Sequence, residues 1–273
     1  MAGFLVDAKR CKRCGICAKV CPARIIDWQA DEKPRMETDR EKRCIRCGQC
    51  MAFCPAGACT APGIPAALET LDASLLPSPE AVEELLAYRR SIRNFTKTAV
   101  AHDMLVHLAD VTRYAPTAQN RQALRWIVAG TRERVTELAR LTVEWLESLP
   151  DTDPVLAARM QAPGMVSVYR SGYDIIMRGA PHLLIAAGPD EGWAKVDAAI
   201  ALTYLEIAAV SRGIGACWAG YFTIACGHPA GKAIRGALGL APGEGMLGAQ
   251  MLGYPAFRPA AKPWRKPLNI TEF

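Results

Sequence analysis

A cysteine pattern that is written twice constrains this chain more than any other feature. Between Cys11 and Cys54 the run Cys-x-x-Cys-x-x-Cys-x-x-x-Cys-Pro occurs two times, the second copy 33 residues after the first. The copies consist of Cys11, Cys14, Cys17 and Cys21, and of Cys44, Cys47, Cys50 and Cys54. A repeat this strict is typical of one folding unit used twice. The sequence therefore predicts a small amino-terminal domain built from two similar halves.

The spacing of these cysteines indicates what they bind. Three cysteines separated by two residues lie on one tight loop, so their thiolates can reach three iron corners of a cubane 4Fe-4S cluster. In two-cluster ferredoxins the fourth cysteine of each run crosses over to the other cluster. We therefore expect two 4Fe-4S clusters as cofactors. The expected ligand sets are Cys11, Cys14, Cys17 and Cys54 for one cluster, and Cys44, Cys47, Cys50 and Cys21 for the other.

Zinc is the alternative metal, because Cys-x-x-Cys pairs also build tetrahedral zinc sites. The third cysteine in both halves and the proline after the fourth have no role in such a site, so the pattern favours iron–sulfur clusters. Three further cysteines, Cys59, Cys217 and Cys226, stand outside the pattern. Free cysteine usually behaves as a small buried hydrophobe, and we expect these three in or near the core.

Length and composition bound the organisation of the chain. Its 273 residues, 51% of them hydrophobic, suffice for one small and one medium domain. Residues 1–10 lack the apolar core of a secretory signal, and eleven cysteines without one indicate metal ligation in a reducing compartment, which predicts a cytoplasmic protein. No apolar run approaches the roughly 20 residues that span a bilayer, so no membrane association is expected.

The formal charge of +6 does not predict a nucleic-acid partner. Eight bound thiolates against two cluster cores of about +2 each would remove roughly four units of charge. Basic residues are scattered along the chain, apart from the pairs Lys9-Arg10, Lys12-Arg13 and Lys42-Arg43 beside the cysteines. These pairs either screen the charge of the clusters, meet an acidic electron donor, or are solvated loop residues.

A proline-rich connector divides the chain. Residues 60–80 carry four prolines and no sustained period. We therefore expect a ferredoxin-like domain in residues 1–62, a linker in residues 63–78 and a second domain in residues 79–273. Ser78-Pro79-Glu80 supplies a helix N-cap, a proline at the first helical position and an acid in the first turn.

The second domain reads as helices with a few interspersed strands, which predicts an α+β arrangement of helices covering a sheet. Residues 193–212 are apolar almost all round, so they form either a central buried helix or part of a subunit interface. The other expected helices are 79–90, 102–114, 131–148, part of 153–178 and 228–238, and the expected strands are 124–129, 182–187 and 246–252.

Four segments of this domain are candidates for a binding site. Residues 88–95 hold three arginines and a hydroxyl, which bind phosphate or carboxylate, or form a solvated turn. Residues 115–122 form an amide-rich loop, suited to a heterocycle or to an ordinary helix end. Residues 212–222 carry three glycines, Trp218 and Tyr221, which would let the backbone approach a planar ligand. Residues 253–267 are a proline-rich basic tail, or a plain extended terminus.

In this order and spacing the four segments resemble the nitroreductase family of FMN-dependent flavoproteins over residues 80–273. The motifs are Arg-Arg-Ser-x-Arg-x-Phe, Ala-Pro-Thr-x-x-Asn-x-Gln and Gly-x-Gly-x-Cys-Trp-x-Gly. With the cysteine repeat, the chain is similar to ferredoxin–nitroreductase fusions. The resemblance implies a nitroreductase-like mixed sheet covered by helices, preceded by a small two-cluster ferredoxin-like α+β domain. It also implies a homodimer with two FMN molecules at the interface.

The resemblance also implies roles for individual residues. The flavin phosphate and ribityl end would be held by Arg89, Arg90, Ser91, Arg93 and Arg265. The partner subunit would contribute Pro116, Thr117, Ala118, Asn120 and Gln122. The isoalloxazine would be lined by Trp218, Ala219 and Gly220. The chain departs from the family pattern at Ala118, where serine is common, at Tyr221, where a second glycine is common, and at Ala123-Leu124, where Pro-Trp is usual.

These expectations predict an oxidoreductase in which electrons pass from the clusters through FMN to a flat, electron-poor acceptor such as a nitroaromatic or a quinone. The expected donor is a ferredoxin-type protein or NAD(P)H. No acid–base side chain stands out, so we name no catalytic residue. Alternatives are an enone reductase or reductive dehalogenase on the same fold, and a non-catalytic electron-transfer or redox-sensing module.

Overall fold

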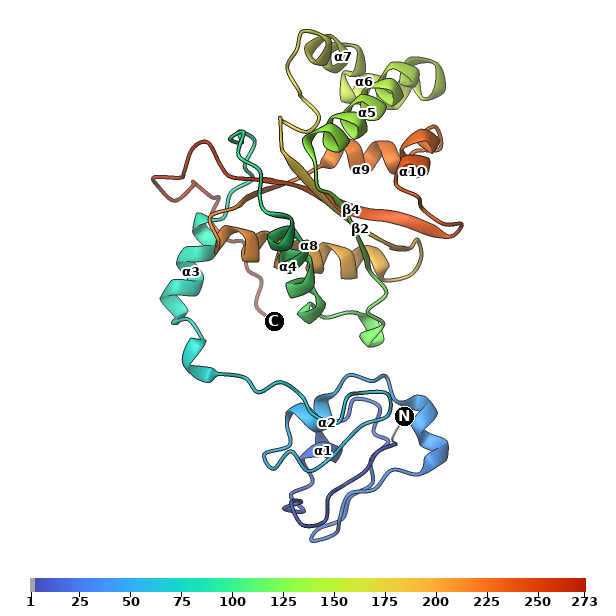
Figure 1. The fold of residues 1–273 in the computed structure, drawn as a ribbon, viewed down its shortest axis with the longest axis vertical. Helices are drawn as coiled ribbons and strands as arrows, with labels where there is room; N and C mark the ends of the chain where they lie inside the picture. Colours follow the sequence, from blue (N-terminus) through green and yellow to red (C-terminus); the bar gives the residue numbers. More distant parts are fainter. Residues whose placement is uncertain (1–2) are drawn as a thin grey trace. The chain divides into compact units, whose positions relative to one another are not determined.

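The computed structural model describes residues 3–273 and divides into two compact units, which we describe separately. The first unit holds the described residues up to Leu76 together with Gln119–Arg121, and the second holds Pro77–Ala118 and Gln122–Phe273. Figure 1 traces the chain from blue to red through both units. The first two residues of the expected ferredoxin-like domain lie outside the described range.

In the first unit the cysteine repeat is also a repeat of backbone conformation. Gly15 and Gly48 both have φ of 70° and stand at the start of short helices. A side chain at Gly15 would meet Trp28, since an added Cβ would lie 2.4 Å from the indole. The helical segments are α1 (Ile16–Lys19) and α2 (Gln49–Ala52), with 3₁₀ turns η1 (Thr38–Arg43) and η2 (Ala73–Leu75).

The core of the first unit is small and lies between the two halves. Its buried members come from both copies of the repeat and from the segments that flank them. They are Phe4, Cys17, Ile26, Cys50, Met51, Cys59 and Ala61. β-pairing among the described residues of this unit is limited to two antiparallel bridges, Val6 with Cys59 and Asp27 with Arg35. The cysteine loops therefore determine the structure of this unit more than regular secondary structure does.

A four-stranded sheet forms the centre of the second unit. Its strands lie in the order β1-β2-β4-β3, and all three strand pairs are antiparallel. A single parallel bridge between Ser91 and Ala216 adds the mixed character expected from the sequence. The strands are β1 (Arg125–Ala129), β2 (His182–Pro189), β3 (Gly215–Trp218) and β4 (Glu244–Gly253). The runs predicted as strands correspond to β1, β2 and β4.

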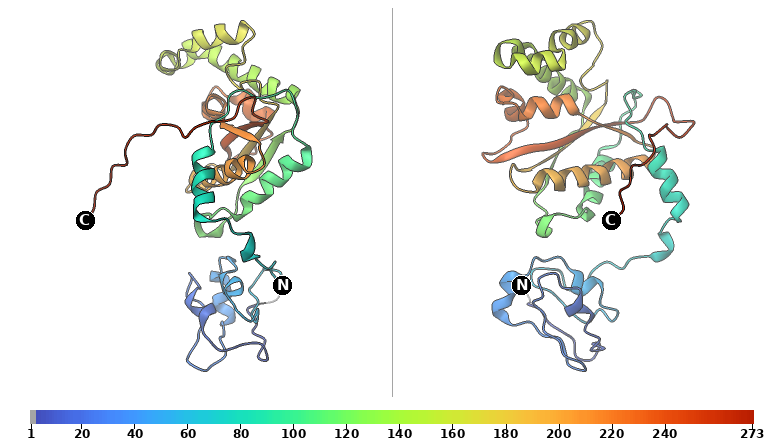
Figure 2. Two further views of the ribbon diagram at one scale, coloured as in Figure 1. Left: turned by 90° about the vertical axis from the view of Figure 1, so that its left-hand side faces the viewer. Right: turned by 180° about the vertical axis from the view of Figure 1, so that it is seen from behind.

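Helices cover both faces of this sheet, which confirms the predicted α+β fold class. One buried cluster joins the sheet to α4 (His102–Val111) and α8 (Ala194–Val210), and another joins its opposite face to α5 (Arg132–Thr152) and α9 (Gly220–Gly227). Figures 1 and 2 show these two layers on either side of β2 and β4. The remaining elements are α3 (Pro79–Tyr88), α6 (Pro154–Met160), α7 (Ala162–Arg170), α10 (Lys232–Ala237), and the 3₁₀ turns η3 (Thr112–Tyr114) and η4 (Ala118–Asn120).

Helix α8 is apolar on two sides. Its inner side packs on the sheet through Leu202 and Leu205, which are fully buried. Its outer side exposes Val196 and Tyr204, at 46% and 39%. The first alternative for residues 193–212 is therefore confirmed, because the helix is central to the unit, and the helix also leaves an apolar outer side.

The two ends of the second unit differ in secondary structure. At its start the predicted N-cap is confirmed, since Ser78 Oγ accepts a hydrogen bond from the backbone N–H of Ala81 at 3.2 Å. At its end residues 256–273 have no helix or strand and extend away from the body of the unit (Figure 2). No helix in residues 3–273 has the length and apolar character needed to cross a bilayer.

Candidate functional site

The eight repeated cysteines line two separate cavities in the first unit. One cavity is lined by Cys11, Cys14, Cys17 and Cys54, and the other by Cys21, Cys44, Cys47 and Cys50. The fourth cysteine of each run thus faces the cavity formed by the other run, as crossed ligation requires.

The surroundings of the thiols are uneven. Burial raises the pKa of Cys17 to about 11 and also raises the pKa of Cys44. Burial acts in the same sense on Cys54, but backbone N–H donors, chiefly that of Ala58 at 3.2 Å from Cys54 Sγ, lower its pKa overall. The neighbouring thiol of Cys59 lowers the pKa of Cys50. N–H donors of this kind stabilise a thiolate, which is the form that binds metal.

The cysteines surround space and do not converge on a point. Among the described residues, no three His, Cys, Asp or Glu side chains gather as they would around one metal ion. A cubane cluster places its four ligands at the corners of a larger body than a single ion. The residues of both cavities fit such a group.

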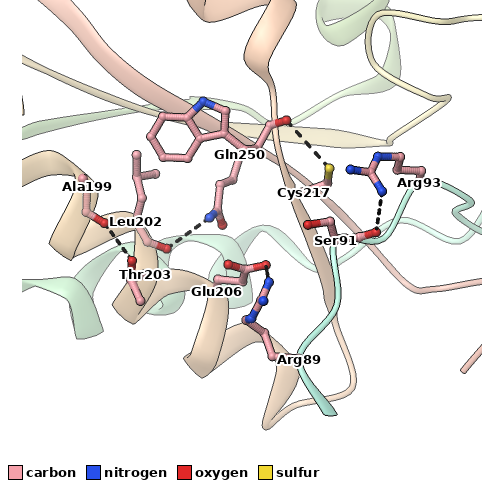
Figure 3. A network of polar contacts seen from close by, with 10 residues as sticks. Arg89, Ser91, Arg93, Ala199, Leu202, Thr203, Glu206, Cys217 and Gln250 are labelled. Carbon is pink, nitrogen blue, oxygen red and sulfur yellow. Dashed lines mark hydrogen bonds and ion pairs between the residues drawn. The ribbon is translucent and has the colours of Figure 1, made fainter. Parts of the chain in front are cut away.

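In the second unit an arginine group lies at the end of α3. Arg89 forms an ion pair with Glu206 of α8, with 2.9 Å between Nη1 and Oε1 (Figure 3). Burial lowers the pKa of the Arg90 guanidinium, and the charges of Arg265 and Arg89 lower it further. The tail therefore brings Arg265 close enough to act on Arg90. Several guanidinium groups against one carboxylate are suited to a phosphate dianion.

The segment that follows these arginines is attached to strand β3. The backbone N–H of Ile92 donates to the carbonyl of Ala216 at 2.9 Å, and Ile92 packs on Gly215, where an added Cβ would lie only 2.7 Å from it. Arg93 turns back toward its own loop, with 3.5 Å between Nη1 and the Ser91 carbonyl (Figure 3). Ser91 is thereby held beside the strand that carries Trp218.

Trp218 presents an aromatic surface at the end of β3. Its indole lies over Gly248 of β4, where an added Cβ would approach it to 2.7 Å, and the residue remains 41% exposed. Ala219 continues the pairing by donating its N–H to the Ala249 carbonyl at 2.9 Å, and Gly220 then opens α9. A flat ring can stack against such a surface.

The amide-rich loop is held by helix α8. Asp197, which is buried, accepts a hydrogen bond from the Ala118 N–H at 2.9 Å. The loop has left-handed backbone at Gln119, Asn120 and Gln122, with φ between 47° and 55°. Such conformations are costly for residues other than glycine and cluster at functional sites. The loop is therefore a strained, anchored segment and not a plain turn.

The loop residues do not share one environment. Thr117 and Gln122 line a surface cavity together with Trp126 of β1, and the Gln122 N–H donates to Thr117 Oγ1 at 3.2 Å. Pro116 is exposed. Asn120, which belongs to the first unit, donates two hydrogen bonds to the carbonyls of Ile45 and Arg46 at 3.1 and 3.0 Å. Within one chain the predicted flavin residues thus form two groups, the arginine and Trp218 group and the loop group.

Sequence reasoning missed three polar residues beside these groups. Glu206 and Asp197 stand in an otherwise apolar helix, and this isolation was a signal that each has a partner. Gln250 of β4 is buried next to Trp218 and donates to the Leu202 carbonyl at 3.2 Å, while its Oε1 has no partner among the described residues (Figure 3). The available signal for Gln250 was its place as a polar residue inside the apolar run predicted as strand 246–252.

Comparison with known proteins agrees with this arrangement. The model of the nitroreductase family matches residues 86–254, and that of the 4Fe-4S dicluster domain matches residues 10–58. No curated protein matches the chain. Among solved structures, a nitroreductase with bound FMN from Bacteroides fragilis NCTC 9343 is 23% identical, covers 70% of this chain and 98% of its own, and gives a TM-score of 0.56.

A second solved structure is similar to the same extent. The nitroreductase with bound FMN from Desulfitobacterium hafniense DCB-2 is 25% identical, covers 70% of this chain and 97% of its own, and gives a TM-score of 0.54. The family model covers more than half of the chain. The chain therefore belongs to the nitroreductase family of flavin oxidoreductases and carries a 4Fe-4S dicluster domain ahead of its nitroreductase domain.

Proposed function

We propose that this protein passes electrons from two 4Fe-4S clusters through FMN to a flat, electron-poor organic acceptor, nitroaromatic or quinone-like. The observation that carries the proposal is the pair of four-cysteine cavities in a chain whose other domain is a nitroreductase. Clusters exchange single electrons, and a domain that delivers them has a purpose only if the adjoining domain collects them.

The cluster ligands in this proposal follow the two cavities. A thiolate from each of three positions on one loop and one from the opposite run would close each site. The sets are Cys11, Cys14, Cys17 and Cys54, and Cys21, Cys44, Cys47 and Cys50. The backbone N–H groups of Arg13 and Ala58, which donate to Cys11 and Cys54 sulfur at 3.4 and 3.2 Å, would favour the thiolate form.

For FMN we propose that Arg90, Ser91, Arg93 and Arg265 hold the phosphate and ribityl end. The pKa of Arg90, lowered by burial and by Arg265, supports this, because a bound dianion would relieve the repulsion between the guanidinium groups. Arg89 would contribute its positive charge to the phosphate site while it stays paired with Glu206. Trp218, Ala219 and Gly220 would lie along the isoalloxazine. When bound, FMN accepts electrons singly and delivers them in pairs.

We further propose that the protein is a homodimer. The outer side of α8, with exposed Val196 and Tyr204, would pack against a second copy, which explains an apolar surface on an otherwise well-packed helix. Pro116, Thr117, Ala118 and Gln122 of one copy would then complete the flavin site of the other. Asn120 would join them only after giving up its two hydrogen bonds to Ile45 and Arg46.

The protein's own contribution to the reaction is positioning and electrostatics. The arginine group would hold one end of the flavin, Trp218 and the backbone of β3 would line its ring, and a flat acceptor would stack on the other face of that ring. We therefore assign no catalytic side chain.

The test uses anaerobically purified protein. We expect iron and FMN to be present, and we expect both the cluster and the flavin spectra to bleach on reduction and to recover when a nitroarene is added. Cys47→Ala should remove the signal of one cluster and slow donor-driven turnover at least about tenfold, with FMN retained. Cys226→Ala, which changes a buried cysteine outside both cavities, is the matched control.

The result that would overturn the proposal is turnover with NADPH alone during which the cluster spectra never change. A protein without iron would overturn it as well.

A further inference from the structure

The loop Lys9–Cys14 carries the densest group of cations in the first unit. Lys9, Arg10, Lys12 and Arg13 are all exposed, and so is Cys14, a proposed cluster ligand. The carboxylate of Asp7 accepts the backbone N–H groups of Lys9 and Arg10 at 2.8 and 3.3 Å, which fixes the turn from which both side chains project.

These cations are not neutralised by the side chains around them. Within residues 3–273 none of the four forms an ion pair, whereas Arg40 of the same unit pairs with Asp27 and Glu37 at 2.9 and 3.3 Å. Arg13 is engaged through a backbone carbonyl, that of Asp31 at 3.1 Å. Asp7, Asp31 and Glu32 are the acids in the neighbouring segments, so the loop keeps a net positive charge in its surroundings.

The loop is also tied to one cavity. Lys12 lines the cavity of Cys11, Cys14, Cys17 and Cys54, and the Arg10 guanidinium lies against Gly57, where an added Cβ would be 2.9 Å from Nη2. In the second half of the repeat, Ile45 stands in place of Lys12, and Cys47 is half-buried whereas Cys14 is exposed. The two cluster sites therefore differ in charge and in access from solvent.

We propose that the loop Lys9–Cys14 is the docking surface for an acidic one-electron carrier protein, and that electrons enter at the site of Cys11, Cys14, Cys17 and Cys54. The inference rests on the proposed function, because it needs a cluster at that site. In each encounter the reduced carrier loses one electron and the site gains one, with no bond formed or broken. Unpaired cations steer an acidic partner, and the exposed Cys14 brings the partner next to a cluster ligand.

The positive charge of the loop alone would also favour binding of a nucleic acid. Binding a phosphate backbone, however, does not require an exposed cluster ligand among the cations, whereas electron transfer does. The combination favours a redox protein.

The experiment uses the holoprotein and an acidic plant-type ferredoxin as the probe. The association rate is measured by stopped-flow mixing of reduced ferredoxin with the protein, and the affinity by calorimetry, at low and at high ionic strength. We expect Lys9→Glu with Arg10→Glu to lower the association rate more than about tenfold at low ionic strength, and to converge on the wild type near 1 M salt.

The repeat supplies a control of equal charge. Lys42→Glu with Arg43→Glu makes the same change at the equivalent place before Cys44, and we expect it to change the association rate less than about threefold. Equal effects of the two pairs would overturn the proposal, since net charge alone would then account for them. Reduction by dithionite should be the same in all variants.

The outcomes also separate this proposal from the proposed function. Clusters that dithionite reduces but that ferredoxin neither binds nor reduces would overturn the docking surface alone. Protein without iron would overturn both. Binding of a labelled oligonucleotide that the Lys9 and Arg10 pair abolishes, without binding of ferredoxin, would assign the loop to nucleic acid and overturn the proposal.

Discussion

Single residues distinguish the two halves of the cysteine repeat. Cys59 and Ile26 stand 33 residues apart at equivalent places, both are buried, and each lines a different cavity. Cys59 donates its thiol to the Cys50 carbonyl at 3.0 Å, which an isoleucine cannot do. Two clusters with the same ligands would therefore meet surroundings of different polarity.

Exchanging this pair is expected to move the reduction potentials selectively. Cys59→Ile makes the cavity of Cys14 less polar, which disfavours the more negatively charged reduced state and lowers the potential of that cluster by more than it shifts the potential of the other. A change of roughly 1 kcal/mol, typical of one polar contact, corresponds to about 40 mV for one electron. Potentiometric titration followed by electron paramagnetic resonance measures it. Ile26→Cys should move the other cluster upward, and a uniform shift of both clusters would contradict this account.

His182 gives the second unit a pH dependence. The residue is buried, its Nε2 accepts the Val100 N–H at 2.8 Å, and its Nδ1 lies 3.1 Å from the Gly130 carbonyl. Burial lowers the pKa of this imidazole, so the folded state resists a proton that the unfolded state accepts. The contribution of neutral His182 to the free energy of unfolding is fully present above the imidazole pKa of the unfolded state, about 6.5. It is lost as pH falls from there toward the lower pKa of the folded state.

The measurement is the thermal midpoint of unfolding between pH 5 and pH 8 for the wild type and for His182→Gln. We expect the difference between the two proteins to shrink as pH falls below about 6.5, because only the wild type loses this contribution. A difference that stays constant over the whole range would show that His182 does not titrate with folding.

At the scale of elements, the sequence predicted what has a strong local pattern. The start of α3 at Ser78, the apolar strands β1, β2 and β4 and the long helix α8 all follow from period and capping. Residues 212–222 were expected only as a glycine-rich segment after the helix 193–212, and the sequence did not predict that 215–218 form β3 or that 220–227 form α9. Strand β3 forms because it pairs with β4, which lies more than twenty-five residues further along the chain. The local sequence pattern around residues 215–218 does not indicate such a distant partner.

The residues of the candidate site also divide into those that the sequence could predict and those that it could not. Its cysteines could be named from spacing, because three ligands of one cluster lie close together in sequence, whereas its arginines were named from the family resemblance. The ion pair of Arg89 with Glu206 and the hydrogen bond of Ala118 with Asp197 join residues that are distant in sequence. They arise from packing of the sheet on α8, so only the structure could reveal them.

The outer side of α8 is expected to decide the oligomeric state. Tyr204→Glu places a charge in the proposed subunit interface, where its desolvation would cost more than the contact gains. We expect a monomer by light scattering after size exclusion, with loss of bound FMN. Val155→Glu, on the exposed α6, is the control and should leave the mass unchanged. A dimer with full flavin content in Tyr204→Glu would place the interface elsewhere.

For the molecule as a whole, the net charge is expected to show how many clusters are bound. The chain without cofactors carries a formal +6. Each cluster bound by four thiolates removes about two units, so two clusters leave about +2 and one leaves about +4. Isoelectric focusing under anaerobic conditions, with flavin removed from both samples, compares the forms with and without iron. A step of about two units would mean that only one cavity is filled.

The exchange of fourth thiols between the two cysteine runs has a consequence for damage by oxygen. Neither run lines a site with all four of its own cysteines, so a fragment or a deletion that spares one copy of the motif leaves three sulfurs at one site and a single sulfur at the other. Oxidation of Cys21 or Cys54 opens the site belonging to the opposite run. Under the proposed ligation the two sites therefore depend on each other, because each run supplies one sulfur to the site of the opposite run.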